Sequence, residues 1–168
     1  IVVGGGIAGI SAAVAASREG SKTLILEKGI VFGGLATVGL INWYEPLCDG
    51  QGTKMIGGIA EELIKLSVKY SFQDLPEKWG GTDTSREDGR YSTHFSPTIF
   101  AMAIDEYLKA NNVDILLDCL MTYPVMEDNR CKGIVVEAKE GRLFLPAKVV
   151  IDATGDASVF AAAGAETV

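Results

Sequence analysis

A glycine-rich turn near the amino end of the chain limits the possible folds more than any other feature. Residues 4–9 read Gly-Gly-Gly-Ile-Ala-Gly, a GxGxxG pattern that follows the β-branched run 1–3 and precedes small and apolar residues as far as Arg18. This order of strand, tight turn and helix predicts the opening of a Rossmann-type βαβ unit. Glycine lets the main chain turn sharply, and bare N–H groups at the positive end of a helix dipole can approach a diphosphate. The candidate diphosphate-binding residues are Gly4, Gly6, Ile7, Ala8 and Gly9.

An acidic residue after the next predicted strand argues against a plain glycine-rich turn with no ligand. Gly20 ends the helix, and residues 22–26 form the nearly continuous apolar run typical of a buried parallel strand. Glu27 follows, 18 residues beyond Gly9, where a dinucleotide fingerprint places an acid that accepts hydrogen bonds from a ribose. The alternative for Glu27 is a solvated charge at a strand end. Lys28 is a candidate for the ribose or adenine edge, and a surface lysine is its alternative.

The remaining elements follow from apolar periodicity and turn signals. The sequence predicts an α/β chain with a parallel sheet and an inserted antiparallel meander of three strands. In chain order we expect an irregular glycine-rich segment at 30–53, an amphipathic helix at 59–70, a polar stretch at 73–93, a helix from Ser96-Pro97 to Asn111-Asn112, a strand at 113–117, the meander at about 119–146, a strand at 148–151 and a helix at 157–163.

Two further loops favour a flavin over a nicotinamide dinucleotide. One has the sequence Gly-Gly-Leu-Ala-Thr and follows Glu27 closely, and the other, residues 152–156, ends the last predicted strand. Both are predicted to lie at the carboxyl edge of the sheet, where ligands bind in open α/β folds. A simple nicotinamide-binding domain has little need for either loop or for the meander. The candidate residues in these loops are Gly33, Gly34, Leu35, Ala36, Thr37, Ala153, Thr154, Gly155 and Asp156.

Taken together, these motifs make the chain similar to FAD-dependent oxidoreductases of the glutathione-reductase-like superfamily, close to its FAD-oxidored branch. The resemblance covers nearly the whole chain and includes GGIAEEL at 57–63 and DATGDA at 152–157. It implies a Rossmann-like flavoprotein fold, with FAD diphosphate at 4–9, the adenosine ribose at Glu27 and the flank of the cofactor at 153–156. It also implies that the backbone of Met121 is offered to adenine. Because residues 33–37 include no histidine, the resemblance implies noncovalent FAD.

The chain also departs from the full pattern of that superfamily. A substrate domain and a late Gly-Asp segment are not found in it, and it begins at Ile1 without a methionine. We therefore expect residues 1–168 to be an incomplete FAD-binding domain, inactive alone, from a larger FAD-dependent oxidoreductase. The catalytic residues, the substrate, the electron acceptor and the oligomeric state are not predicted. The alternatives are an NAD-binding dehydrogenase domain and a non-catalytic dinucleotide-binding module.

Composition limits the partners of the chain. It has 168 residues, 48% of them apolar, which is enough for about one domain. Lys and Arg total 15 against 22 Asp and Glu, so the net charge of −7 argues against nucleic-acid partners. The glycines at 4–9 interrupt the uncharged opening stretch, so no membrane span is expected. The three cysteines have no metal-ligand spacing, so we expect neither disulfides nor a metal site. A chain without disulfides fits a reducing compartment, so we expect a cytoplasmic location.

A few polar residues outside these motifs are weaker candidates. His94 is the sole histidine and could approach a substrate, although a structural or solvated role is favoured. Arg86 and Arg90 could clamp a carboxylate, but the acids beside them favour a solvated charge cluster.

Overall fold

A parallel sheet of four short strands is built around the opening strand of the chain. In this computed structural model, which describes residues 1–76, 79 and 91–166, the strand order is β5-β2-β1-β9. Val3 pairs with Leu26 on one side and with Asp152 on the other. The predicted parallel sheet is therefore confirmed. Its strands are β1 (Val2–Val3), β2 (Leu24–Leu26), β5 (Asp114–Leu116) and β9 (Ile151–Asp152).

The last of these strands corrects the predicted boundaries. We expected a strand at 148–151, whereas β9 begins at Ile151 and includes Asp152. Its partner β1 begins at Val2, so only Ile1 precedes it to form backbone hydrogen bonds with the residues before Ile151. One hydrogen bond, from the Ile1 nitrogen to the Val149 carbonyl at 2.9 Å, extends the pairing by a step.

Helix α1 (Ile7–Arg18) follows β1 and packs its inner face, including Ile10, Ala13 and Val14, in the core. Its carboxyl end is tied to the end of α3 (Pro97–Ala110) through Ser17, whose hydroxyl donates to the Asn111 carbonyl at 2.6 Å. The predicted cap of α3 is present, because the Ile99 N–H lies 3.4 Å from the Ser96 hydroxyl. Both predicted helices are confirmed.

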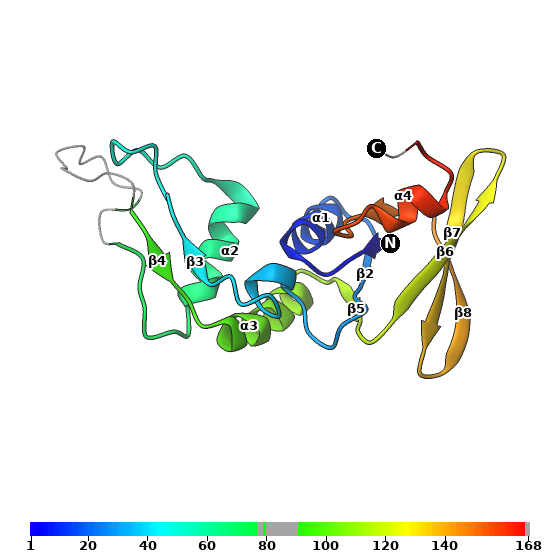
Figure 1. Ribbon diagram of the computed structural model, residues 1–168, viewed down its shortest axis with the longest axis horizontal. Helices are drawn as coiled ribbons and strands as arrows, with labels where there is room; N and C mark the ends of the chain where they lie inside the picture. Colours follow the sequence, from blue (N-terminus) through cyan, green and yellow to red (C-terminus); the bar gives the residue numbers. More distant parts are fainter. Residues whose placement is uncertain (77–78, 80–90, 167–168) are drawn as a thin grey trace. The chain divides into compact units, whose positions relative to one another are not determined.

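The predicted meander is a separate antiparallel sheet in the order β6-β7-β8 (Figure 1). Its strands are β6 (Leu120–Glu127), β7 (Arg130–Ala138) and β8 (Gly141–Pro146). Ile134 and Val136 of β7 are fully buried in a cluster with Val3, Leu26 and Val159. Val3 and Leu26 belong to the parallel sheet, and Val159 belongs to α4 (Ser158–Ala162). The meander therefore packs against the parallel sheet and α4 through this cluster.

The chain divides into two compact units, Ile1–Gly34 with Asp105–Val168, and Leu35–Ile104. The second unit holds part of η1 (Gly34–Ala36), the short ribbon of β3 (Trp43–Tyr44) and β4 (Thr93–His94), and α2 (Gly58–Val68). The predicted amphipathic helix at 59–70 is thus confirmed. The ribbon was not predicted, because its strands have two residues each and lie some fifty residues apart in the sequence.

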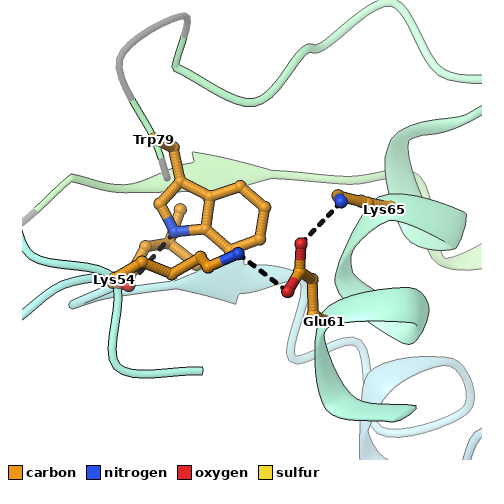
Figure 2. A network of polar contacts seen from close by, with 5 residues as sticks. Lys54, Glu61, Lys65 and Trp79 are labelled. Carbon is orange, nitrogen blue, oxygen red and sulfur yellow. Dashed lines mark hydrogen bonds and ion pairs between the residues drawn. The ribbon is translucent and has the colours of Figure 1, made fainter. Parts of the chain in front are cut away.

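Trp79 packs against the buried core of this second unit, beside α2. Its indole nitrogen donates to the Leu47 carbonyl at 3.2 Å, and its ring packs against a cluster that contains Leu47, Cys48 and Ile64. Figure 2 shows that Glu61 pairs with both Lys54 and Lys65, whose ammonium groups lie 5.5 and 6.0 Å from the centre of the Trp79 ring.

Among the described residues, no helix combines the length and the apolar character needed to cross a bilayer.

Candidate dinucleotide-binding site

Three loops leave neighbouring strands at the carboxyl edge of the parallel sheet. The Gly4 N–H donates to the Leu26 carbonyl at 2.9 Å, and the Ala153 N–H donates to the Val3 carbonyl at 2.8 Å. β1 lies between β2 and β9: the chain adds β2 and β5 on one side of β1 and then returns to add β9 on the other side. Such a reversal of strand order is where open α/β sheets bind ligands.

Three of the four glycines in the opening turn are required by the chain itself. Gly4 has φ of +101°, and a Cβ there would lie 2.6 Å from the Ala153 carbonyl oxygen. A Cβ at Gly9 would collide with the Gly4 carbonyl, and one at Gly5 would collide with the Phe32 ring. These positions hold glycine because β1, α1 and the neighbouring loops approach one another closely.

Gly6 differs from the other three glycines. Its φ of −71° suits any residue, and apart from its two neighbours in the chain no atom of the described residues lies within 4 Å of the place where its Cβ would be. Gly6 is also the N-cap of α1, where it offers no side chain to the first N–H groups of the helix. Ile7 and Ala8 of that first turn are exposed. The amino end of α1 therefore faces open space with uncapped donors, which suits an anion that approaches the backbone.

Glu27 is not a solvated charge. Its Oε2 accepts the Gly5 N–H at 2.7 Å, and its Oε1 accepts the Gly29 N–H at 2.8 Å. These two bonds hold the carboxylate over the glycine-rich turn. A carboxylate offers about four lone-pair sites, so two remain for the hydroxyls of a ribose.

The second loop lies directly against the first. The Gly33 N–H donates to the Gly5 carbonyl at 2.8 Å, and a Cβ at Gly34 would lie 3.1 Å from the Gly6 Cα. Phe32 is fully buried behind this contact. The structure thus brings Gly33 and Gly34 to the glycine-rich turn. The rest of the motif, Leu35, Ala36 and Thr37, belongs to the second unit, where the Leu35 carbonyl accepts the Ile41 N–H and the Thr37 carbonyl accepts the Leu40 N–H.

The third loop contains a residue that the sequence analysis did not place in the site. Asp152 Oδ1 accepts the backbone N–H and the hydroxyl of Thr154, and Oδ2 accepts the N–H groups of Val159 and Phe160 at 2.9 Å each. Burial raises the pKa of the Asp152 carboxyl, but these hydrogen bonds outweigh burial and hold the pKa below its ordinary value. The sequence signal was an acid at a strand end, a few residues before a predicted helix.

The candidate residues of this loop differ in exposure. Ala153 and Thr154 are half-buried against the glycine-rich turn, whereas Gly155 and Asp156 are exposed. The Thr154 hydroxyl also accepts the Ser158 N–H at 2.8 Å, so Thr154 links Asp152 to the start of α4. Side-chain to backbone bonds therefore hold this loop in place within one unit.

A shallow open hollow of about 290 Å³ lies beside the strand end that carries Glu27. The Cys119 N–H donates to the Glu27 carbonyl at 3.2 Å and the Asp118 N–H to the Gly29 carbonyl at 2.9 Å, which places the start of β6 next to Lys28. Met121 pairs with Val136 in the meander, and its side chain packs against the buried cluster of β7 rather than into the hollow. The hollow is lined by Lys28, Asp118, Leu120, Glu137, Ala138 and Lys139.

The weaker candidates belong to the second unit or lie outside the described residues. His94 lies on β4 in the second unit, where its ring stacks on Trp43 with centroids 5.8 Å apart. Arg86 and Arg90 lie outside the described residues. Cys48 belongs to the buried cluster of the second unit, and no disulfide joins the cysteines at 48, 119 and 131.

The strand order, the GxGxxG turn and the anchored acid define this unit as a Rossmann-like dinucleotide-binding domain. Comparison with known families is more specific: the whole chain, residues 1–168, matches the family model described as FAD dependent oxidoreductase. The chain belongs to that family. The predicted family, the FAD cofactor and the flavin-binding function are thereby confirmed, and the comparisons do not favour the NAD-binding alternative.

Individual proteins and solved structures are also similar to the chain. The chain is 29% identical to a thiamine thiazole synthase of Sulfolobus acidocaldarius over 97% of its own length and 57% of the relative. Among solved structures it resembles Thermovibrio ammonificans THI4, with a TM-score of 0.62 and 20% identity over 96% of this chain and 59% of that one. It also resembles L-proline dehydrogenase from P. horikoshii, with a TM-score of 0.62 and 17% identity over 99% and 56%. The chain thus spans somewhat more than half the length of these relatives.

Proposed function

We propose that this chain is the part of a flavin-dependent oxidoreductase that holds FAD without a covalent bond. The observation that carries the proposal is Gly6, since neither its backbone angles nor its surroundings require glycine. An absent side chain at the uncapped start of α1 is explained when a diphosphate must approach the N–H groups of Ile7, Ala8 and Gly9 closely. The neighbouring glycine at Gly4 keeps the turn tight enough for that approach.

The rest of the cofactor follows from the neighbours of this turn. Glu27 keeps two acceptor sites for the adenosine ribose, and Lys28 lines a hollow in which adenine would lie next to Leu120 and the backbone of Met121. Gly33, Gly34 and the turn Ala153–Asp156 would flank the diphosphate and ribityl chain. For Leu35, Ala36 and Thr37 the proposal rests on the sequence motif. FAD supplies the redox chemistry by accepting and returning electrons, while the residues of this chain bind and orient it.

The activity and extent of the intact protein are part of the proposal. We place residues 1–168 in one incomplete FAD-binding domain, with the meander at about 119–146 as an insertion and the substrate domain elsewhere in the intact protein. Oxidoreductase activity would then require residues outside 1–168. The three cysteines form no disulfide, which agrees with a reducing compartment, and we place the protein in the cytoplasm.

The test compares two glycines that cap helices in the same manner. Gly6 caps α1 and Gly57 caps α2; both are extended, and a Cβ at either would meet no described atom within 4 Å. In the intact protein, Gly6→Ala should weaken FAD binding at least about tenfold in a flavin fluorescence titration, because its methyl group occupies the path of the phosphates. Gly57→Ala should leave the affinity unchanged.

The two variants also separate folding from binding. Both replace a glycine N-cap by alanine, so their losses of stability should be similar. Equal FAD affinity in the Gly6→Ala and wild-type proteins would overturn the proposed diphosphate site.

A further inference from the structure

Asp152 has no acceptor capacity left for a ligand. Its two oxygens accept four hydrogen bonds, two from Thr154 and one each from Val159 and Phe160, at distances of 2.7 to 3.0 Å. A carboxylate offers about four lone-pair sites, so the set is complete. Glu27, on the opposite side of β1, accepts two hydrogen bonds from the described residues, so about two of its acceptor sites remain for a ligand. The two acids that flank the opening turn therefore have different chemical roles.

The four donors fold the chain after β9 back on itself. They span residues 154 to 160, and the Thr154 hydroxyl adds a further bond by accepting the Ser158 N–H. Ala157 within this turn has φ of +52°, a left-handed conformation that costs a non-glycine residue about 1 kcal/mol. Helix α4 has five residues and is too short to be stable alone. The Asp152 carboxylate thus helps to stabilise this unfavourable turn and the first residues of α4.

The same turn is in close contact with the glycine-rich loop. A Cβ at Gly4 would lie 2.6 Å from the Ala153 oxygen and 3.0 Å from the Thr154 nitrogen, and one at Gly9 would lie 3.3 Å from the Ala153 Cβ. No side chain separates the two loops at these points. A displacement of residues 153–154 therefore reaches Gly4 and Gly9 directly.

We propose that Asp152 is a positioning residue for the cofactor site, which holds the turn 153–157 against the glycine-rich loop and does not itself touch the cofactor. This inference rests on the proposed FAD function. If the turn is released part of the time, the apparent affinity for FAD falls by the fraction of molecules that keep the bound arrangement.

Asp152→Asn is the sharpest variant, because it is nearly isosteric. It replaces one acceptor oxygen by an NH₂ donor, which cannot satisfy either the Thr154 pair or the two α4 amides. Asp114→Asn is the matched control: Asp114 is exposed at the amino end of β5, in the same unit but away from the carboxyl edge. Both variants change the net charge by the same amount.

Two measurements are made on the intact protein. In the FAD-free form, hydrogen exchange at the Val159 and Phe160 amides should become at least about tenfold faster in Asp152→Asn and stay unchanged in Asp114→Asn. In a fluorescence titration, Asp152→Asn should raise the FAD dissociation constant about three- to tenfold, and Asp114→Asn should not. Both results together support the inference.

Other outcomes overturn it in distinguishable ways. Faster amide exchange with unchanged FAD affinity would show that the turn does not position the site, while the proposed FAD function would stand. Weaker FAD binding with unchanged exchange would make Asp152 a ligand contact instead. Failure of the wild-type protein to bind FAD would remove the proposed function and this inference with it, whatever the exchange rates.

A second variant covers the case in which Asp152→Asn does not fold. Thr154→Val removes the hydroxyl that joins Asp152 to Ser158, whereas Thr154→Ser keeps it. Amide exchange at Ser158, Val159 and Phe160 in the FAD-free protein should rise in Thr154→Val and be restored in Thr154→Ser. Equal exchange in the two variants would contradict the role given to the Asp152 and Thr154 pair.

Discussion

At the scale of single residues, two carboxylates hold the loops on either side of the opening strand. Glu27 bonds to Gly5 and Gly29, and Asp152 bonds to Thr154 and the start of α4. Side chains of this kind replace the backbone ladder where the strands end, since loops at a sheet edge must find partners for their N–H groups elsewhere. The geometry of the candidate site thus depends on residues that need not contact its ligand.

The hydrogen bonds of Asp152 predict a dependence of stability on pH. Because its pKa is lower in the folded protein than in the unfolded chain, its contribution is present above the unfolded pKa of about 3.9 and is lost as pH falls through the folded pKa. The elements packed on it add few charges: β1 and α4 have none, α1 has Arg18, and the turn has Asp156. The free energy of unfolding of wild type should therefore exceed that of Asp152→Asn at neutral pH, with the gap narrowing below about pH 4.

Urea unfolding of both proteins across that pH range measures the gap. A difference that is constant with pH, or that widens in acid, would contradict the sign of the shift.

At the scale of secondary-structure elements, the meander and the parallel sheet share a single buried cluster. Val136 and Ile134 of β7 contact Val3 of β1, Leu26 of β2 and Val159 of α4. This packing fixes β6 beside the strand end that carries Glu27, where the Cys119 N–H meets the Glu27 carbonyl. The meander is thereby part of the wall of the proposed adenine hollow.

Two valines test that packing. Val136 is 0% exposed and Val149 is 65% exposed. Val136→Ala should lower the free energy of unfolding by about 2 kcal/mol, because it removes two buried methyl groups and leaves a cavity. Val149→Ala should change it by less than about 0.5 kcal/mol. Chemical denaturation measures both, and equal losses would show that the cluster does not fasten the meander.

At the scale of the whole molecule, the chain belongs to the FAD dependent oxidoreductase family and spans little more than half the length of its relatives. The described part provides a dinucleotide-type sheet, its loops and a second unit with its own core.

Ligand-induced stabilisation tests the cofactor for the intact protein. A ligand that binds the folded state at one hundred times its dissociation constant adds about 2.7 kcal/mol to stability. Saturating FAD should therefore raise the Tm of the FAD-free protein by about 5–10 °C, whereas NAD at the same concentration should leave it unchanged. Thermal unfolding measures both. An increase with NAD and none with FAD would contradict the flavin assignment.

Features that depend on the local order of residues along the chain were predictable before the structure was known. The glycine pattern at 4–9, the apolar run before Glu27 and the two turn signals of the meander predicted the strands and the first helix. The loops at 33–37 and 152–156 favoured a flavin. Each of these signals depends on residues adjacent in sequence. Features that depend on contacts between segments far apart in the sequence became evident only from the tertiary structure. The structure showed that close contacts require glycine at Gly4 and Gly9 but not at Gly6. It also showed that the Glu27 carboxylate accepts a hydrogen bond from Gly5, and that the Asp152 carboxylate already accepts four hydrogen bonds. Those properties arise from contacts across the sheet edge, which no local pattern encodes.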